Sequence, residues 1–271
     1  MIIDINDVKY NVKLLGQGEP IWFLLHGFMG SLHDFDKIAP HLPGTVLVPD
    51  LLGHGLSTSQ IPSSRFTVIR QVKDLISLTS HFKISKLNLV GYSMGGRLAL
   101  SLSLKYPQVI SHLFLESSTA GIENKQARQL RQQHDSGLVK KLQTIPLKAF
   151  VKQWASQPLF NSQTKLPLDL QEQIELQRKN QDAQGLVGSL KSFGTGVMPN
   201  FWPQLSKCQI PITLICGFRD QKFRKITLKM AQRFPHVKRM VIPKAGHNVH
   251  LEKPQQYIAI LRNNWHENYI N

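Results

Sequence analysis

The fold is decided by the stretch Leu87-Asn88-Leu89-Val90-Gly91-Tyr92-Ser93-Met94-Gly95-Gly96-Arg97. An apolar run precedes a G-x-S-x-G pattern, and the helix-forming residues Leu98-Ala99-Leu100 follow it. This order predicts a strand, a sharp turn and a helix, which is the context in which a serine becomes a nucleophile. The backbone at such a turn is strained, and glycines two residues either side of the serine let strand and helix pass closely. We therefore predict that Ser93 lies exposed at a helix N-terminus, where free N–H groups favour negative charge.

Composition places the chain among ordinary globular proteins. It has 271 residues, of which 41% are hydrophobic and 18% charged, enough to form one large α/β domain or a core with an insertion. Met1–Asp4 lacks the basic and apolar regions of a signal peptide, and no apolar stretch approaches the roughly 18 residues that span a membrane. Cys208 and Cys216 resemble small core residues. We therefore expect a cytoplasmic protein without membrane insertion.

The net charge of +16 is unusual. It is compatible with nucleic-acid or membrane binding, with an anionic substrate, or with solubility alone. The basic excess is greatest after residue 206, where it is spread over a predicted helix surface and the following loop, and no basic run is interleaved with aromatic residues. This distribution favours a solvated basic face over nucleic-acid binding.

Strand and helix patterns alternate along most of the chain. Short apolar or β-branched runs predict strands at Val8–Leu15, Ile21–Leu25, Thr45–Val48, Leu87–Val90, His112–Leu115, Ile212–Cys216 and Lys238–Ile242. Helical patterns occupy Phe66–His81, Ser93–Tyr106, Arg224–Phe234 and Pro254–Trp265. Such alternation predicts a mainly parallel sheet covered on both faces, with ligands bound beyond the carboxyl ends of its strands.

The alternation stops in residues 119–205. Only helical stretches are evident there, at Glu123–His134, Leu147–Ser156, Leu168–Asn180 and Asp182–Lys191. We expect a core built from residues 1–118 and 206–271, with 119–205 forming an all-helical cap over the active site.

A nucleophilic or basic Ser93 needs a histidine to take its proton and a carboxylate to orient that histidine. His247 follows the last predicted strand and is favoured over its neighbour His250 as the base. Asp220 also follows a strand and precedes His247, which is the chain order Ser, Asp, His expected on this architecture. The alternative carboxylates are Asp50, for which turn capping is the simpler role, and Glu116, which ends the strand before the insertion.

The same edge of the sheet offers an oxyanion hole. His26-Gly27-Phe28 follows the strand Ile21–Leu25, so the N–H groups of Phe28 and Met94 would converge on one oxygen. His26 itself is expected to brace this loop as a hydrogen-bond donor. Together with the nucleophile, base and carboxylate, these elements predict an α/β-hydrolase fold whose site needs no metal and no cofactor.

Basic residues outside the triad narrow the chemistry. Arg97 lies one helical turn after Ser93, close enough to reach a substrate, although a salt bridge to the insertion is the simpler role. The insertion adds Arg128 and Arg131, Trp154, and Arg178. Several buried arginines are costly unless they pair with carboxylates, so we expect a small polycarboxylate substrate. The sequence does not define an oligomeric state.

The chain also resembles a known family, the 2-succinyl-6-hydroxy-2,4-cyclohexadiene-1-carboxylate synthases of menaquinone biosynthesis. The resemblance is carried nearly end to end by Gly91–Arg97, Glu116-Ser117-Ser118, Trp154 with Gln157-Pro158, Arg178-Lys179-Asn180, Gly194-Thr195-Gly196, Asp220–Phe223, and Ala245–Asn248 with His250. Leu52 stands where many relatives have proline, which we interpret as a loop variation.

This resemblance implies a carbon–oxygen lyase that eliminates pyruvate. Ser93 and His247 would form the base, oriented by Asp220, and the N–H groups of Phe28 and Met94 would hold the enolate-like oxygen. It further implies that carboxylates bind Arg97, Arg131 (chosen over Arg128 for its spacing to Asp135) and Arg178, with Tyr92 and Trp154 shaping the pocket. The alternatives are a serine esterase or C–C hydrolase that forms an acyl-enzyme, and a catalytically silent scaffold.

Overall fold

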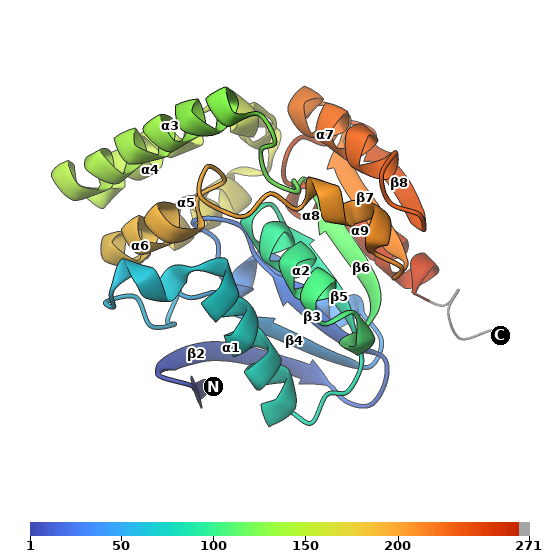
Figure 1. Ribbon diagram of the computed structural model, residues 1–271. Coiled ribbons are helices and arrows are strands. Elements are labelled where there is room, and N and C mark those ends of the chain that lie inside the picture. The colour runs from blue at the N-terminus through green and yellow to red at the C-terminus, as the bar shows by residue number, and fades with distance from the viewer. Residues whose placement is uncertain (266–271) are drawn as a thin grey trace.

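One twisted eight-stranded sheet forms the centre of the molecule (Figure 1). The computed structural model describes residues 1–265. The strand order is β1-β2-β4-β3-β5-β6-β7-β8. The two pairs β1–β2 and β2–β4 are antiparallel, and the remaining pairs are parallel. The strands are β1 (Ile2–Ile5), β2 (Val8–Gly16), β3 (Ile21–Leu25), β4 (Thr45–Pro49), β5 (Leu87–Tyr92), β6 (Ile110–Glu116), β7 (Ile212–Gly217) and β8 (Val237–Ile242).

Helices cover both faces of this sheet and fill the segment between β6 and β7 (Figure 1). Those that pack on the core are α1 (Val68–His81), α2 (Met94–Lys105), α7 (Gln221–Ala231), α8 (Val249–Glu252) and α9 (Pro254–Asn264). Those between β6 and β7 are α3 (Lys125–Thr144), α4 (Leu147–Ala155), α5 (Leu168–Lys179) and α6 (Ala183–Phe193). We call residues 119–205 the helical insertion.

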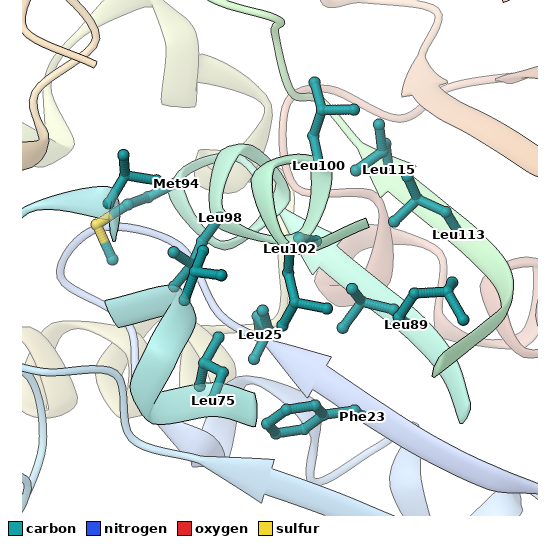
Figure 2. Close-up of a cluster of buried hydrophobic side chains, with 14 of the residues drawn as sticks. Phe23, Leu25, Leu75, Leu89, Met94, Leu98, Leu100, Leu102, Leu113 and Leu115 are labelled. Carbon is teal, nitrogen blue, oxygen red and sulfur yellow. The ribbon is translucent and has the colours of Figure 1, made fainter. Parts of the chain in front are cut away.

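The period-two geometry of a strand explains how the sheet is buried on both faces. In β3, Phe23 and Leu25 join the apolar cluster beneath α1 and α2, part of which Figure 2 shows. Trp22 and Leu24 point the other way and join a cluster with α9. The four side chains are fully buried, which accounts for the uninterrupted apolar run of this strand.

The predicted fold class is confirmed, and every predicted strand is present. The sequence missed β1, a short edge strand that pairs only with β2 through Ile2–Ile5. The first helix of the insertion was predicted to end at His134, whereas α3 continues to Thr144. Its turns carry few apolar residues, so their helical pattern is weak in the sequence.

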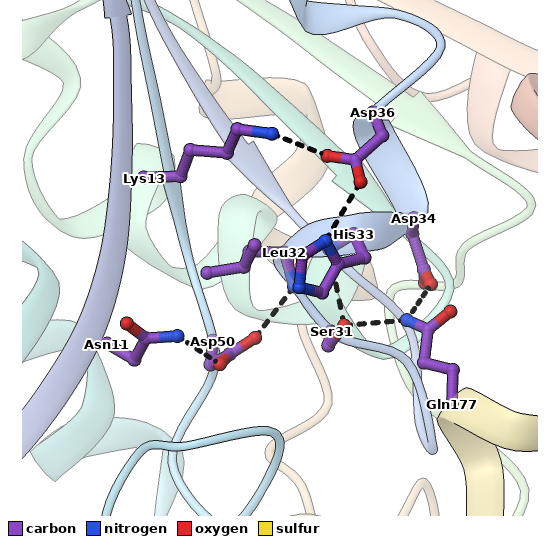
Figure 3. A network of polar contacts seen from close by, with 9 residues as sticks. All are labelled: Asn11, Lys13, Ser31, Leu32, His33, Asp34, Asp36, Asp50 and Gln177. Carbon is purple, nitrogen blue, oxygen red and sulfur yellow. Dashed lines mark hydrogen bonds and ion pairs between the residues drawn. The ribbon is translucent and has the colours of Figure 1, made fainter. Parts of the chain in front are cut away.

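The helical insertion packs on itself and on the core. Val139, Phe150 and Leu186 form a buried cluster with Met29, which comes from the loop after β3. Gln177 of α5 donates to Ser31 Oγ at 2.6 Å and to Asp34 Oδ1 at 2.7 Å, as Figure 3 shows.

The predicted core range 206–271 includes residues 266–271, which lie outside the described part of the chain. Within residues 1–265 no helix is both long and apolar enough to cross a membrane.

Candidate active site

Ser93 occupies the turn between β5 and α2 in a left-handed backbone conformation, with φ 50° and ψ −102°. This conformation is strained for a residue with a side chain. Close packing explains the glycines around it: a Cβ on Gly95 would lie 2.2 Å from the carbonyl oxygen of Leu25, and one on Gly91 would lie 2.6 Å from Gly96 Cα. The turn therefore presents Ser93 at the N-terminus of α2, half-buried in the molecule.

The structure brings Ser93, His247 and Asp220 together from three segments of the chain. His247 Nε2 lies 3.3 Å from Ser93 Oγ, and His247 Nδ1 lies 2.7 Å from Asp220 Oδ2. Because an ionised carboxylate only accepts hydrogen bonds, Nδ1 carries the proton and Nε2 is free to accept one from Ser93. Asp220 is itself held by the N–H group of Phe223, which donates to Oδ1 at 3.0 Å. This arrangement suits a general base.

Two backbone N–H groups are available beside the serine. Phe28 and Met94 both line the cavity that contains Ser93. Neither N–H group has an acceptor among the described residues, whereas the next one along, Gly95 N–H, donates to the carbonyl oxygen of His26 at 3.0 Å. A pair of free N–H groups next to a nucleophile can stabilise a developing oxyanion.

The structure gives Asp50 a different role from that of Asp220. Its carboxylate accepts from Leu32 N–H at 2.7 Å and from Asn11 Nδ2 at 2.8 Å, as Figure 3 shows. It also accepts from Leu56 N–H at 2.9 Å. These bonds brace the loops after β3 and β4. The other two alternatives, Glu116 and His250, bond to each other, with His250 Nδ1 2.7 Å from Glu116 Oε2.

The cavity at Ser93 has a volume of about 100 Å³ and lies between the core and the helical insertion. A wider groove of about 650 Å³ adjoins it and shares Arg131, Trp154, Lys222 and His247 with it. Of the predicted site residues, the cavity is lined by Ser93, His247, Phe28, Met94, Arg97, Arg131, Tyr92 and Trp154. Asp220 lies behind His247 and lines the groove.

Arg97 is buried in this cavity without a carboxylate partner among residues 1–265. Its Nη1 donates to the carbonyl oxygen of Phe193 at 2.6 Å, and the guanidinium lies 4.6 Å from the centroid of the Phe193 ring. Burial, together with the nearby positive charge of Arg131, lowers the pKa of Arg97 to about 9 against a smaller opposing effect of the Asp135 charge, which is not within ion-pair distance of Arg97. A buried cation in this state is stabilised by an incoming anion. Arg97 is therefore the strongest candidate for an anion ligand next to Ser93.

The structure separates the two arginines of α3. Arg131 lines the cavity and donates from Nε to Asp135 Oδ1 at 2.8 Å. Arg128 donates instead to the carbonyl oxygens of Val197 and Met198, and it is not among the residues that line the cavity.

Arg178 and Lys222 are placed differently from what the sequence suggested. Arg178 is buried against Phe160, with its guanidinium 5.1 Å from the centroid of that ring, and it does not line the Ser93 cavity. It lines a smaller neighbouring cavity, which shares Tyr92 and Phe160 with the Ser93 cavity. Lys222, one of the basic residues after residue 206, lines both the Ser93 cavity and the groove, although we did not predict it as a site residue. Burial, followed by the charge of Arg131, lowers its pKa. The sequence did contain a signal for this position, because Lys222 lies two residues after Asp220, a predicted site residue.

Two buried histidines support the loop of Phe28. His26 Nε2 accepts from Leu51 N–H at 2.8 Å, so its Nδ1–H donates to the carbonyl oxygen of Gly27 at 2.7 Å. His26 is thus the loop-bracing donor that we expected, and it also accepts a hydrogen bond from Leu51. His54 contacts both His26 and Phe28 through its ring. Burial, and secondarily His26, lower the pKa of His54 to about 3.

The pKa of His54 predicts acid sensitivity of the fold. Between pH 6.5 and 3 the unfolded chain protonates this histidine and the folded chain does not, so stability falls as the pH falls. From this group alone, we expect the free energy of unfolding to drop by about 2 kcal/mol between pH 7 and pH 5. The measurement is urea unfolding at both pH values, with His54→Asn as the control because its amide can still donate to the carbonyl oxygen of Leu52. An equal drop in the wild type and the variant would contradict the prediction.

Fold and site together define an α/β hydrolase, with a Ser-His-Asp triad at the carboxyl edge of a mainly parallel sheet. The chain matches the alpha/beta hydrolase fold family over residues 20–254. It is 38% identical to a Bacillus subtilis protein provisionally named 2-succinyl-6-hydroxy-2,4-cyclohexadiene-1-carboxylate synthase, over 88% of this chain and 87% of that protein. It is 32% identical to the Escherichia coli O1:K1 / APEC protein of that name, over 90% of this chain and 93% of that protein.

A solved structure agrees with these relatives. The structure of MenH from S. aureus superposes with a TM-score of 0.89 at 30% identity, over 93% of this chain and 96% of that one. The chain belongs to the 2-succinyl-6-hydroxy-2,4-cyclohexadiene-1-carboxylate synthase family, so it is an enzyme acting on a small molecule.

Proposed function

We propose that this enzyme eliminates pyruvate from 2-succinyl-5-enolpyruvyl-6-hydroxy-3-cyclohexene-1-carboxylate to form 2-succinyl-6-hydroxy-2,4-cyclohexadiene-1-carboxylate. One observation carries the proposal beyond family membership. The triad shares its cavity with Arg97, a buried cation that has no carboxylate partner among the described residues. A substrate with three carboxylates suits such a site, whereas a neutral ester would leave the cation unpaired.

In this reaction Ser93 and His247 act together as the base. Ser93 Oγ takes a ring proton activated by the succinyl ketone and passes its own proton to His247 Nε2, 3.3 Å away. The electron pair of the broken C–H bond forms an enolate, whose oxygen the N–H groups of Phe28 and Met94 stabilise. The pair then returns to form the second ring double bond as the ring C–O bond breaks. The leaving enolpyruvate takes a proton at carbon and becomes pyruvate. The proton held on His247 balances this one, so the Ser93–His247 pair returns to its starting state and no acyl-enzyme forms.

Basic residues hold the carboxylates in this proposal. Arg97 and Arg131 lie in the same cavity as Ser93, and a guanidinium can bind a carboxylate through two hydrogen bonds. Arg178 lines a neighbouring cavity that shares Tyr92 and Phe160 with the Ser93 cavity, so it would bind a carboxylate that extends into that space. Tyr92 and Trp154 shape the cavity walls. We also propose that residues 119–205 act as a cap, and that the enzyme works in the cytoplasm, which its buried free thiols at Cys208 and Cys216 support.

Pyruvate release tests the proposed function. The enolpyruvyl substrate is mixed with the enzyme, and pyruvate is followed through NADH consumption by lactate dehydrogenase. We expect catalysed release well above the spontaneous rate, and no burst of p-nitrophenol from an activated ester. Turnover indistinguishable from spontaneous decomposition would refute the lyase proposal. A stoichiometric ester burst would favour a hydrolase that forms an acyl-enzyme.

A further inference from the structure

Four hydrogen bonds converge on Glu116, the last residue of β6. Its backbone carbonyl oxygen accepts from Ser93 N–H at 2.8 Å. Its carboxylate Oε1 accepts from the N–H groups of Val249 at 2.5 Å and His250 at 3.2 Å, and Oε2 accepts from His250 Nδ1 at 2.7 Å. One fully buried residue thus bonds to the nucleophile's backbone and to the segment directly after His247.

His250 is buried together with this carboxylate. Its ring stacks on Phe35 at a centroid distance of 4.9 Å and meets the Tyr92 ring edge-on, also at 4.9 Å. Burial opposes protonation of His250, but the charge and hydrogen bond of Glu116 outweigh it and raise the pKa of the imidazole. The Glu116–His250 pair is therefore closed to solvent, with His250 bonded to Glu116 through Nδ1 and its Nε2 without a hydrogen-bond partner among the described residues.

The carboxylate bonds require a residue with several acceptor positions. A carboxylate offers about four lone-pair sites on two oxygens, which is enough for the three N–H groups that it meets here. A glutamine of the same shape offers one acceptor oxygen and one NH2 group. That NH2 would face either the two backbone N–H groups or His250 Nδ1, and Nδ1 could accept only in the tautomer that leaves the buried Nε2–H without a partner. Each buried unsatisfied donor costs about 1–3 kcal/mol. Residues 247–250 would therefore shift so that these donors find other partners.

We propose that Glu116 is a positioning residue for the Ser93–His247 pair. Its carbonyl oxygen anchors the backbone of Ser93, and its carboxylate anchors the first turn of α8, two residues after His247. The 3.3 Å separation between Ser93 Oγ and His247 Nε2 is therefore set through one residue that touches no substrate. The effect of Glu116 on the rate of pyruvate release rests on the proposed function, whereas its effect on the Ser93–His247 distance does not.

The test is Glu116→Gln, compared with a matched control. We expect kcat for pyruvate release to fall by about 10–100-fold with KM within about twofold, because a misplaced base loses the reacting geometry and not the carboxylate ligands. In the crystal structure of this variant, Ser93 Oγ and His247 Nε2 should lie beyond hydrogen-bond distance. Asp74→Asn is the control, because Asp74 is a buried carboxylate paired with Arg65 at 2.8 Å and does not line the Ser93 cavity. It should lose stability but keep its kcat.

Either of two results would overturn the proposal: a Glu116→Gln kcat no lower than that of Asp74→Asn, or an unchanged Ser93–His247 distance. If Glu116→Gln does not fold, Glu116→Asp replaces it. Aspartate keeps the charge but draws the carboxylate back by one methylene, so the same lengthening and a smaller fall in kcat are expected, and wild-type values of both would overturn the proposal. A wild type that releases no pyruvate refutes the proposed function, and the crystallographic distance then decides the positioning role.

Discussion

Ser93→Ala is expected to reduce kcat for pyruvate release by about 10²–10⁴-fold, the usual contribution of a positioned general base. Alanine removes Oγ, the atom that takes the ring proton in the proposed mechanism, and leaves His247 Nε2 without the group that links it to the substrate. The carboxylate ligands remain, so KM should change little. The measurement is steady-state pyruvate release, with substrate affinity determined by calorimetry on the inactive variant.

Folding is the control for this result. Ser93 has a φ of 50°, which alanine tolerates no better and no worse than serine, so the melting temperature of Ser93→Ala should match that of the wild type. Retention of more than a tenth of wild-type kcat by a folded Ser93→Ala variant would remove the serine from the mechanism.

Arg97→Ala is expected to lower kcat/KM by about 10²-fold or more, because loss of a buried ion-pair partner costs about 3 kcal/mol or more. The guanidinium is the buried cation next to Ser93, and it is held in place by the carbonyl oxygen of Phe193 at 2.6 Å. Arg97→Lys keeps the charge but not the two-pronged geometry, so an intermediate loss is expected. Both are measured by pyruvate release over a range of substrate concentrations.

Arg128→Ala is the matched control for Arg97. Arg128 bonds the carbonyl oxygens of Val197 and Met198, and Arg97 also contacts Met198 through its sulfur at 3.7 Å. Both variants therefore disturb the same segment, but only Arg97 lines the cavity. Equal losses in the two variants would attribute the effect to this segment and would contradict a carboxylate-binding role for Arg97.

Much of the architecture was predictable because it depends on local patterns. Buried parallel strands are apolar on both faces, so runs such as Ile21–Leu25 are recognisable in the sequence, and the Gly-x-Ser-x-Gly turn needs its glycines for close packing. The edge strand Ile2–Ile5 lacks this signal, because it has one neighbour and is partly exposed. The end of α3 was missed for a related reason, since much of its surface faces solvent.

The site was predictable only in part, because contacts between distant residues leave no local pattern. Chain order and strand ends were enough to favour Asp220 and His247 over their alternatives. They could not reveal that Glu116 and His250, the rejected alternatives, bond to each other. Nor could they place Arg178 against Phe160 in a neighbouring cavity, or place Lys222 along the wall of the Ser93 cavity.

The sequence by itself determined the class of fold and the family, and it predicted the residues of the triad, since each depends on short motifs or on chain order. Tertiary structure alone decided which cations share a cavity with Ser93 and what holds His247 opposite it. Those properties depend on side-chain direction and burial across segments more than a hundred residues apart, as between Glu116 and His250. Arg97 illustrates this division. The sequence gives its spacing from Ser93, but only the tertiary structure shows that it is buried and that its guanidinium bonds to the carbonyl oxygen of Phe193 and not to a carboxylate.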